Sequence, residues 1–243
     1  MKTLVINASP RMETGNTQAI LTPFLVGVKE AGGSIDFVNL AKKKINACIG
    51  CFTCYAKTPG KCIYEDDMVQ LAERIKNSDL LVLATPLYID GMPGVAKKFI
   101  DRLVTFMDPH FEIENGNVRH PLRWDFPSKM FLIGVCGYPG VGNFEPLVLH
   151  FERICANFHS KFCGALLRPA IFSILLTRKY PEKIKEVLDA VRSAGHQLIT
   201  EGRVGAETLN VIASDICSPE ELVSMANSYW DRELAKGHDK QPA

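Results

Sequence analysis

The sequence predicts an α/β fold in which a doubly wound, five-stranded parallel sheet carries helices on both faces. The first observation behind this prediction is an alternation: short apolar runs bounded by turn residues are separated by longer segments whose apolar residues recur at helical spacing. The second is composition, since 47% apolar and 23% charged residues are ordinary for a globular protein of 243 residues. The third is that the chain contains no internal repeat, low-complexity tract or linker, which favours a single domain.

The expected elements follow one another in a regular order. The first helix ends at Gly32 and Gly33, a residue type that often follows a helix. Asp66 and Asp67 are interpreted as the cap and the first-turn acid of the second helix. The expected strands cover residues 3–7, 34–40, 80–85, 129–136 and 162–168. The expected helices cover residues 17–29, 67–76, 93–107, 144–158 and 181–201, with an irregular insert at residues 108–128.

We expect a single domain. Residues 1–203 form its α/β part, and residues 204–243 form a C-terminal helical extension and tail of the same domain. For the extension, the sequence predicts a polar loop followed by a helix. This helix begins at Ser218 or Pro219 and ends near Lys236. The tail, residues 237–243, is expected to be disordered.

The charge balance limits the kinds of partner. With 28 basic and 27 acidic residues the formal net charge is +1, so neither nucleic acid nor an anionic membrane is expected as a partner. The chain starts without a signal-peptide pattern and contains no apolar run of membrane-spanning length, which predicts a cytoplasmic protein. In that setting the eight cysteines are expected to be metal ligands, redox groups or buried thiols rather than disulfides.

Residues 7–17, which follow the first strand, offer hydroxyls, a guanidinium and backbone amides just before a helix begins. The helix dipole and the unpaired amides at a helix start both favour an anion. The loop lacks the Gly-Lys-Ser/Thr of a nucleotide-hydrolysing loop and the G-x-G-x-x-G of a dinucleotide-binding fold. A monophosphate group is therefore the expected ligand. An ordinary polar turn, with Asn16 or Thr17 as helix cap, would use the same residues.

Two further loops are expected beside this one, because ligands of doubly wound sheets bind outside the carboxyl ends of the strands. After the third strand, Pro86 fixes the chain and Tyr88 offers a flat surface with a polar tip, although a turn with a core tyrosine would look the same. After the fourth strand, Gly137 and Tyr138 are the candidate ligand contacts.

A compact cysteine run is the second distinctive feature. Cys48, Cys51 and Cys54 are each three residues apart, and Cys62 follows beyond a Pro-Gly pair. Thiols at this spacing can face one iron-sulfur cluster. Zinc fits less well, because structural zinc sites usually split their thiols into two separated pairs. The cysteines could equally pack a loop without any metal.

These motifs resemble those of flavodoxin-like NAD(P)H-dependent FMN reductases and iron-sulfur flavoproteins. The resemblance rests on Ser-Pro-Arg at 9–11 with Gly-Asn-Thr at 15–17, on Pro-x-Tyr at 86–88, and on the cysteine run, and it covers about residues 2–170. It implies a flavodoxin-like sheet with strand order 2-1-3-4-5. It also implies a homodimer or higher homo-oligomer, for which the apolar insert at residues 124–126 is a candidate interface.

The same resemblance implies FMN as cofactor and NAD(P)H as electron donor. FMN would carry the chemistry, so no catalytic side chain is expected. The resemblance also implies that a four-iron (4Fe-4S) cluster is ligated by Cys48, Cys51, Cys54 and Cys62. The residues implied to bind FMN are Ser9, Arg11, Gly15, Asn16, Thr17, Pro86, Leu87, Tyr88, Ile89, Gly137 and Tyr138.

The leading functional hypothesis is an FMN-dependent oxidoreductase that uses NAD(P)H to reduce a small-molecule, flavin or quinone-type acceptor by hydride transfer through FMN. The alternative is an iron-sulfur flavoprotein that carries electrons between a ferredoxin-like partner and FMN. A third hypothesis is a zinc-stabilised interaction module without flavin.

Overall fold

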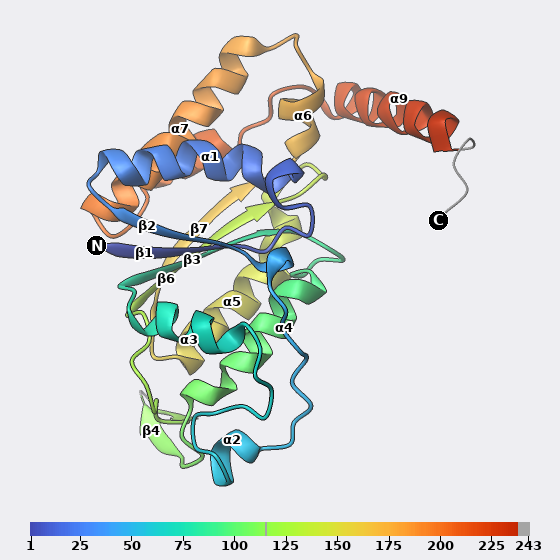
Figure 1. The fold of residues 1–243 in the computed structure, drawn as a ribbon. Helices are drawn as coiled ribbons and strands as arrows, with labels where there is room; N and C mark the ends of the chain where they lie inside the picture. The colour runs from blue at the N-terminus through green and yellow to red at the C-terminus, as the bar shows by residue number, and fades with distance from the viewer. Residues whose placement is uncertain (115, 238–243) are drawn as a thin grey trace.

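The computed structural model describes residues 1–114 and 116–237 (Figure 1). Its main sheet has five parallel strands in the order β2-β1-β3-β6-β7, which confirms the predicted fold class and strand order. The bounds of these strands are Lys2–Asn7 for β1, Ser34–Asn39 for β2, Leu80–Pro86 for β3, Lys129–Val135 for β6 and Lys161–Arg168 for β7.

Helices cover both faces of the sheet, as Figure 1 shows. Side chains alternate between the faces: Leu4 and Ile6 pack toward α3, α4 and α5, whereas Val5 packs toward α1, α7 and α8. The helix bounds are α1 Asn16–Glu30, α2 Thr53–Ala56, α3 Met68–Lys76, α4 Gly94–Arg102, α5 Glu145–Asn157, α6 Ile171–Leu176, α7 Pro181–Thr200, α8 Ala206–Ala213 and α9 Pro219–Gly237.

Several expected elements are corrected. The helix expected over residues 93–107 ends at Arg102 and continues as a 3-10 turn, Leu103–Phe106, where the Thr105 hydroxyl donates to the Arg102 carbonyl at 3.3 Å. Asp67 is the cap residue of α3 rather than an acid of its first turn, and its carboxylate accepts the Lys44 amide at 2.7 Å.

The insert expected to be irregular contains a small antiparallel hairpin, β4 Glu112–Glu114 and β5 Asn117–Arg119. Within the same insert the Phe126 ring stacks on Phe158 at 4.4 Å and meets the edge of Phe106 at 5.3 Å. This side chain of the proposed interface is therefore used inside the chain.

The segment after residue 204 is more ordered than the expected polar loop, because α8 occupies part of it. Arg168, at the end of β7, is fully buried and fastens this segment. Its guanidinium donates to the carbonyls of Ile212 and Ser214 at 2.8 and 2.7 Å and to the Ser173 hydroxyl at 3.0 Å. Burial lowers the pKa of Arg168 to about 10, so it remains a cation at neutral pH.

Residues 238–243 of the expected tail lie outside the described residues, and α9 runs to Gly237. Among the described residues, none of the helices combines the length and the hydropathy needed to cross a membrane.

Helices α1 and α7 cross in direct backbone contact at two glycines. A Cβ on Gly195 would lie 2.1 Å from the Phe24 carbonyl oxygen, and one on Gly27 would lie 1.8 Å from that of Arg192. Gly195→Ala should therefore lower the free energy of unfolding by about 1–3 kcal/mol, measured by urea denaturation. Gly94→Ala in α4 is the control, because a Cβ there meets no atom within 4 Å. Equal effects of the two changes would contradict this view of the crossing.

Candidate functional site

A cleft lies at the carboxyl ends of β1, β3 and β6, where the strand order reverses. This inner cleft has a volume of about 340 Å³. Eight of the predicted cofactor-binding residues line it: Ser9, Arg11, Asn16, Thr17, Pro86, Leu87, Tyr88 and Gly137. An outer cleft of about 820 Å³ adjoins it and is lined in addition by Ile89 and Tyr138.

The loop after β1 is shaped around Ser9 and Gly15. Ser9 is buried, and its amide donates to the side-chain oxygen of Asn7 at 3.0 Å. Gly15 does not line the cleft but packs beneath it: a Cβ there would lie 2.3 Å from the Ser9 hydroxyl oxygen. Arg11 is exposed and donates to the Asn16 side-chain oxygen at 2.6 Å, which holds its guanidinium over the start of α1.

Thr17, in the first turn of α1, carries a buried hydroxyl that has no hydrogen-bond partner among the residues the structure describes. Leaving such a group unpaired costs about 1–3 kcal/mol. Its position at the cleft therefore favours a ligand atom that accepts a hydrogen bond from this hydroxyl. The helix start, the guanidinium of Arg11 and the hydroxyls of Ser9 and Thr17 together suit a phosphate. The residues present therefore fit the phosphate end of FMN.

The loop after β3 forms a tight turn in which Tyr88 and Gly91 exchange backbone hydrogen bonds of 2.9 and 3.1 Å. Ile89 and Asp90 occupy the turn at φ of 48° and 58°, a left-handed conformation that costs about 1–2 kcal/mol per residue. Ile89 is fully exposed at the tip. The amide of Leu87 donates to the Val135 carbonyl at 2.8 Å, which ties this loop to the end of β6.

The loop after β6 packs against α6. The Tyr138 carbonyl accepts the Ala170 amide at 2.8 Å, and the Tyr138 ring is 71% exposed. Cys136 is buried at the floor of both clefts. A Cβ on Gly137 would lie 3.0 Å from the Phe172 ring, so this close approach favours glycine.

Three aromatic residues at the cleft are missing from the sequence-based prediction: Phe172 on α6, and Tyr229 and Trp230 on α9. The sequence signal for Tyr229 and Trp230 is that two large aromatic residues are adjacent in the C-terminal helix. Their position depends on how α6 and α9 fold back over the carboxyl edge of the sheet, which local patterns do not reveal.

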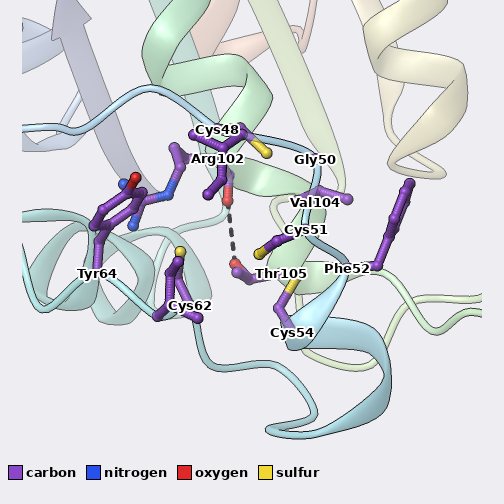
Figure 2. Close-up of a pocket in the computed structure, with 12 residues that line it drawn as sticks. Cys48, Gly50, Cys51, Phe52, Cys54, Cys62, Tyr64, Arg102, Val104 and Thr105 are labelled. Atoms are coloured by element: carbon purple, nitrogen blue, oxygen red, sulfur yellow. Dashed lines mark hydrogen bonds between the residues drawn. The ribbon is translucent and has the colours of Figure 1, made fainter.

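The four cysteines of the run come together in a second pocket, which we call the cysteine pocket. Figure 2 shows Cys62 on one side of it and Cys51 and Cys54 on the other, with Arg102 and Cys48 in the upper part of the view. Burial raises the pKa of the Cys54 thiol, and the three neighbouring thiols raise it further. Hydrogen bonds from Thr53 lower the pKa of the exposed Cys51 thiol. Sulfur ligands grouped in this way suit an iron-sulfur cluster.

A buried ion pair closes the loop that carries these cysteines. The Asp66 carboxylate accepts from the Arg102 guanidinium at 2.6 and 3.1 Å and from the Asn46 amide at 2.9 Å. Arg102 also donates to the Asn46 carbonyl at 2.9 Å. Both ends of the cysteine loop, residues 46–66, are thus joined at one point. Asp66 accepts the Met68 amide as well, at 3.1 Å, but the cap residue of α3 is Asp67, so the interpretation of Asp66 as the cap is wrong.

The two sites lie at different ends of α4. The loop that leads into α4 lines the clefts, whereas Arg102 at its last residue lines the cysteine pocket. Nine helical residues rise about 13 Å, and Figure 1 places α2, in the cysteine loop, and α9 at opposite ends of the molecule. Within one chain, the cysteine pocket and the clefts are therefore separate sites.

Parts of this chain resemble known proteins in sequence. Residues 1–118 match the family model described as NADPH-dependent FMN reductase. An iron-sulfur flavoprotein from Archaeoglobus fulgidus is 38% identical over 154 residues, which are 63% of this chain and 62% of that protein. An iron-sulfur flavoprotein from Methanocaldococcus jannaschii is 37% identical over 102 residues, 42% of this chain and 51% of that protein. The chain thus spans less than two thirds of the length of either relative.

Solved structures share the fold at low identity. An NAD(P)H:quinone oxidoreductase from Methanothermobacter marburgensis has a TM-score of 0.62 at 18% identity, covering 82% of this chain and 96% of that one. An FMN-dependent NADH-azoreductase from Bacillus anthracis, in complex with FMN, has a TM-score of 0.57 at 16% identity, covering 82% and 99%. The fold and the loops at its carboxyl edge define a flavodoxin-like protein. Residues 1–118 are thus similar to NADPH-dependent FMN reductases, and part of the chain is similar to iron-sulfur flavoproteins.

Proposed function

We propose that the protein binds FMN in the inner cleft and uses NAD(P)H to reduce a small-molecule acceptor. The observation that carries the proposal is the buried Thr17 hydroxyl in the first turn of α1, which lies at the cleft with Ser9 and Arg11 and has no partner among the described side chains and backbone groups. The family match and the flavodoxin-like neighbours support the same cofactor and donor.

The side chains of the cleft would bind and orient rather than react. Ser9, Arg11, Asn16 and Thr17 would hold the phosphate through charge-assisted hydrogen bonds, and the start of α1 would add its dipole. The loops after β3 and β6 would hold the flavin ring, with Pro86, Leu87, Tyr88, Ile89, Gly137 and Tyr138 as contacts.

When bound, FMN supplies the capacity to accept a hydride and pass it on. For a quinone acceptor the overall reaction is NAD(P)H plus a proton plus quinone giving NAD(P)⁺ plus hydroquinone. The apolar walls around Cys136 and Phe172 would keep bulk water from the reacting face.

Steady-state kinetics test this proposal. FMN-loaded protein should oxidise NADH or NADPH with menadione as acceptor, and double-reciprocal plots should be parallel because donor and acceptor share one cleft. Intersecting plots would contradict the shared cleft. Absence of NAD(P)H oxidation by FMN-loaded protein would contradict the reductase.

We further propose that the protein is a single domain that works in the cytoplasm as a homodimer or higher homo-oligomer. All eight cysteines are free thiols, which supports a reducing compartment. Sedimentation of the purified chain tests the oligomer, since a monomer at micromolar concentration would contradict it.

A second candidate function, electron transfer through a four-iron cluster to a ferredoxin-like partner, is supported by the cysteine pocket. Cys48, Cys51, Cys54 and Cys62 would hold the cluster, which supplies one-electron chemistry. Among the described residues, no three or more ligating side chains converge where a single metal ion would sit. Zinc needs such convergence at about 2.3 Å from each sulfur, whereas a four-iron cluster spreads its four thiolates over four irons.

Iron analysis tests this candidate. Protein purified without oxygen should hold about four irons and four sulfides per chain. Cys48→Ser should lose most of this iron, whereas Cys217→Ser should keep it, because Cys217 does not line the pocket. Iron-free wild-type protein, or equal iron in both variants, would contradict cluster binding by these cysteines.

A further inference from the structure

Helix α9 reaches beyond the body of the molecule and brings two aromatic side chains to the clefts. Figure 1 shows it extending outward past α6, on which it packs. Its first turn is firmly held: the Tyr180 hydroxyl bonds both carboxylate oxygens of Glu221 at 2.8 Å, and Ser218 caps the helix by accepting the Glu221 amide at 3.2 Å. Leu222, one residue on, is buried. The helix is thus directed by contacts at its start.

Two turns later the helix carries Tyr229 and Trp230. The Tyr229 ring lies 6.4 Å from Phe172 and 5.2 Å from Trp230, the latter pair being edge to face. Trp230 is half exposed and lines both the inner and the outer cleft. A large aromatic surface is therefore left open toward the cleft in which FMN is proposed to bind.

The lining of the outer cleft indicates which class of ligand this aromatic surface would bind. Its lining is apolar or aromatic apart from a few side chains, and Asp90 is the one charged residue among the lining residues, all of which the structure describes. The wall formed by Leu222, Val223 and Ala226 on α9 continues this apolar surface. A flat, uncharged molecule gains from such walls, whereas an anion would meet the Asp90 carboxylate without a compensating cation.

We infer that Trp230, supported by Tyr229 and Phe172, is a specificity-determining residue that selects flat, uncharged aromatic electron acceptors. This inference rests on the proposed FMN-dependent function. The wall belongs to residues 219–237, outside the residues 1–118 that match the family model, so it distinguishes this chain from what that model describes. Trp230 stacks on the acceptor and takes no part in electron transfer itself.

The test compares two acceptors with FMN-loaded protein and NAD(P)H. Menadione is flat and uncharged and takes two electrons and two protons, whereas ferricyanide is a compact anion that takes one electron and cannot stack. For Trp230→Ala, the ratio of kcat/KM for menadione to that for ferricyanide should fall about 3- to 10-fold, mainly through KM. Trp230→Phe should restore most of the ratio. Leu234→Ala, an exposed apolar residue one turn further along α9, is the control and should leave the ratio unchanged.

The outcomes separate the inference from the proposed function. If Trp230→Ala retains FMN and the ratio stays within twofold of wild type, or if Leu234→Ala lowers it equally, the inference is overturned. If the wild type binds no FMN, or its FMN is not reduced by NAD(P)H, the proposed function fails instead and the inference fails with it.

Discussion

Replacing Asp66 by Asn should lower the free energy of unfolding by about 3–5 kcal/mol, because the change leaves a buried guanidinium without its counter-charge. The side chains of Arg102 and Asp66 are 2% and 4% exposed. Urea denaturation followed by circular dichroism measures the effect. The control is Asp101→Asn on the same α4, which breaks an exposed ion pair with Lys97 and should cost less than about 1 kcal/mol.

The same pair gives stability a pH dependence. Burial raises the pKa of Asp66, but the hydrogen bonds from Arg102 and Asn46 outweigh it and lower the pKa to about 2. A carboxyl whose folded-state pKa is depressed contributes its full stability above its unfolded pKa of about 4 and loses it as pH falls toward the folded value. Stability should therefore decline between about pH 4 and pH 2, by about 2–3 kcal/mol from this group. Asp66→Asn should remove that part of the decline.

Equal destabilisation by Asp66→Asn and Asp101→Asn, or an acid profile that Asp66→Asn leaves unchanged, would contradict a dominant role for the buried pair. Asp66 and Arg102 also hydrogen-bond Asn46, at the other end of the cysteine loop. Loss of the ion pair should therefore separate the two ends of this loop. Iron retained at wild-type level in a folded Asp66→Asn variant would show that joining the two ends of the cysteine loop is not needed to keep the four cysteines together.

Thr17→Val should have opposite effects on the fold and on FMN. The change removes a buried hydroxyl that has no partner within residues 1–114 and 116–237, so the cofactor-free chain should become more stable by about 1 kcal/mol. It also removes a donor to the phosphate, and a hydrogen bond to a charged group is worth about 1.5–3 kcal/mol. FMN affinity should therefore fall about 10- to 100-fold. Thermal unfolding without FMN and fluorescence titration with FMN give the two values.

Thr3→Val is the matched control for this experiment. Thr3 in β1 is also fully buried, its hydroxyl likewise has no partner in the described part of the chain, and it does not line the cleft. Its replacement should raise stability similarly and leave FMN affinity unchanged. If both variants bound FMN as tightly as wild type, the hydroxyl of Thr17 would have no role in holding the phosphate.

Much of the fold is readable from the sequence because it depends on local patterns. The apolar runs predict every strand of the main sheet to within one residue at either end. Helical spacing predicts α1, α3, α5 and α7 to a similar accuracy. Spacing also predicts that the four cysteines meet, since three of them are each three residues apart and loop closure brings the fourth.

The missing parts depend on contacts between distant residues. The path of the C-terminal segment is set by Arg168, which holds the carbonyls of Ile212 and Ser214 more than forty residues away. Nothing near Arg168 in the sequence indicates this role, and so neither the path of α9 nor the position of Trp230 is predicted. The Asp66–Arg102 pair escapes prediction for the same reason, since 36 residues separate its members.

The central claim, that the cleft binds FMN through its phosphate, is tested most directly by titrating the FMN-free protein with FMN and with riboflavin, which lacks the phosphate. Quenching of flavin fluorescence reports both affinities. We expect FMN to bind one per chain and at least about tenfold more tightly than riboflavin, because charge-assisted hydrogen bonds and the helix start act on the phosphate alone. Equal affinities, or no binding of FMN, would contradict the claim.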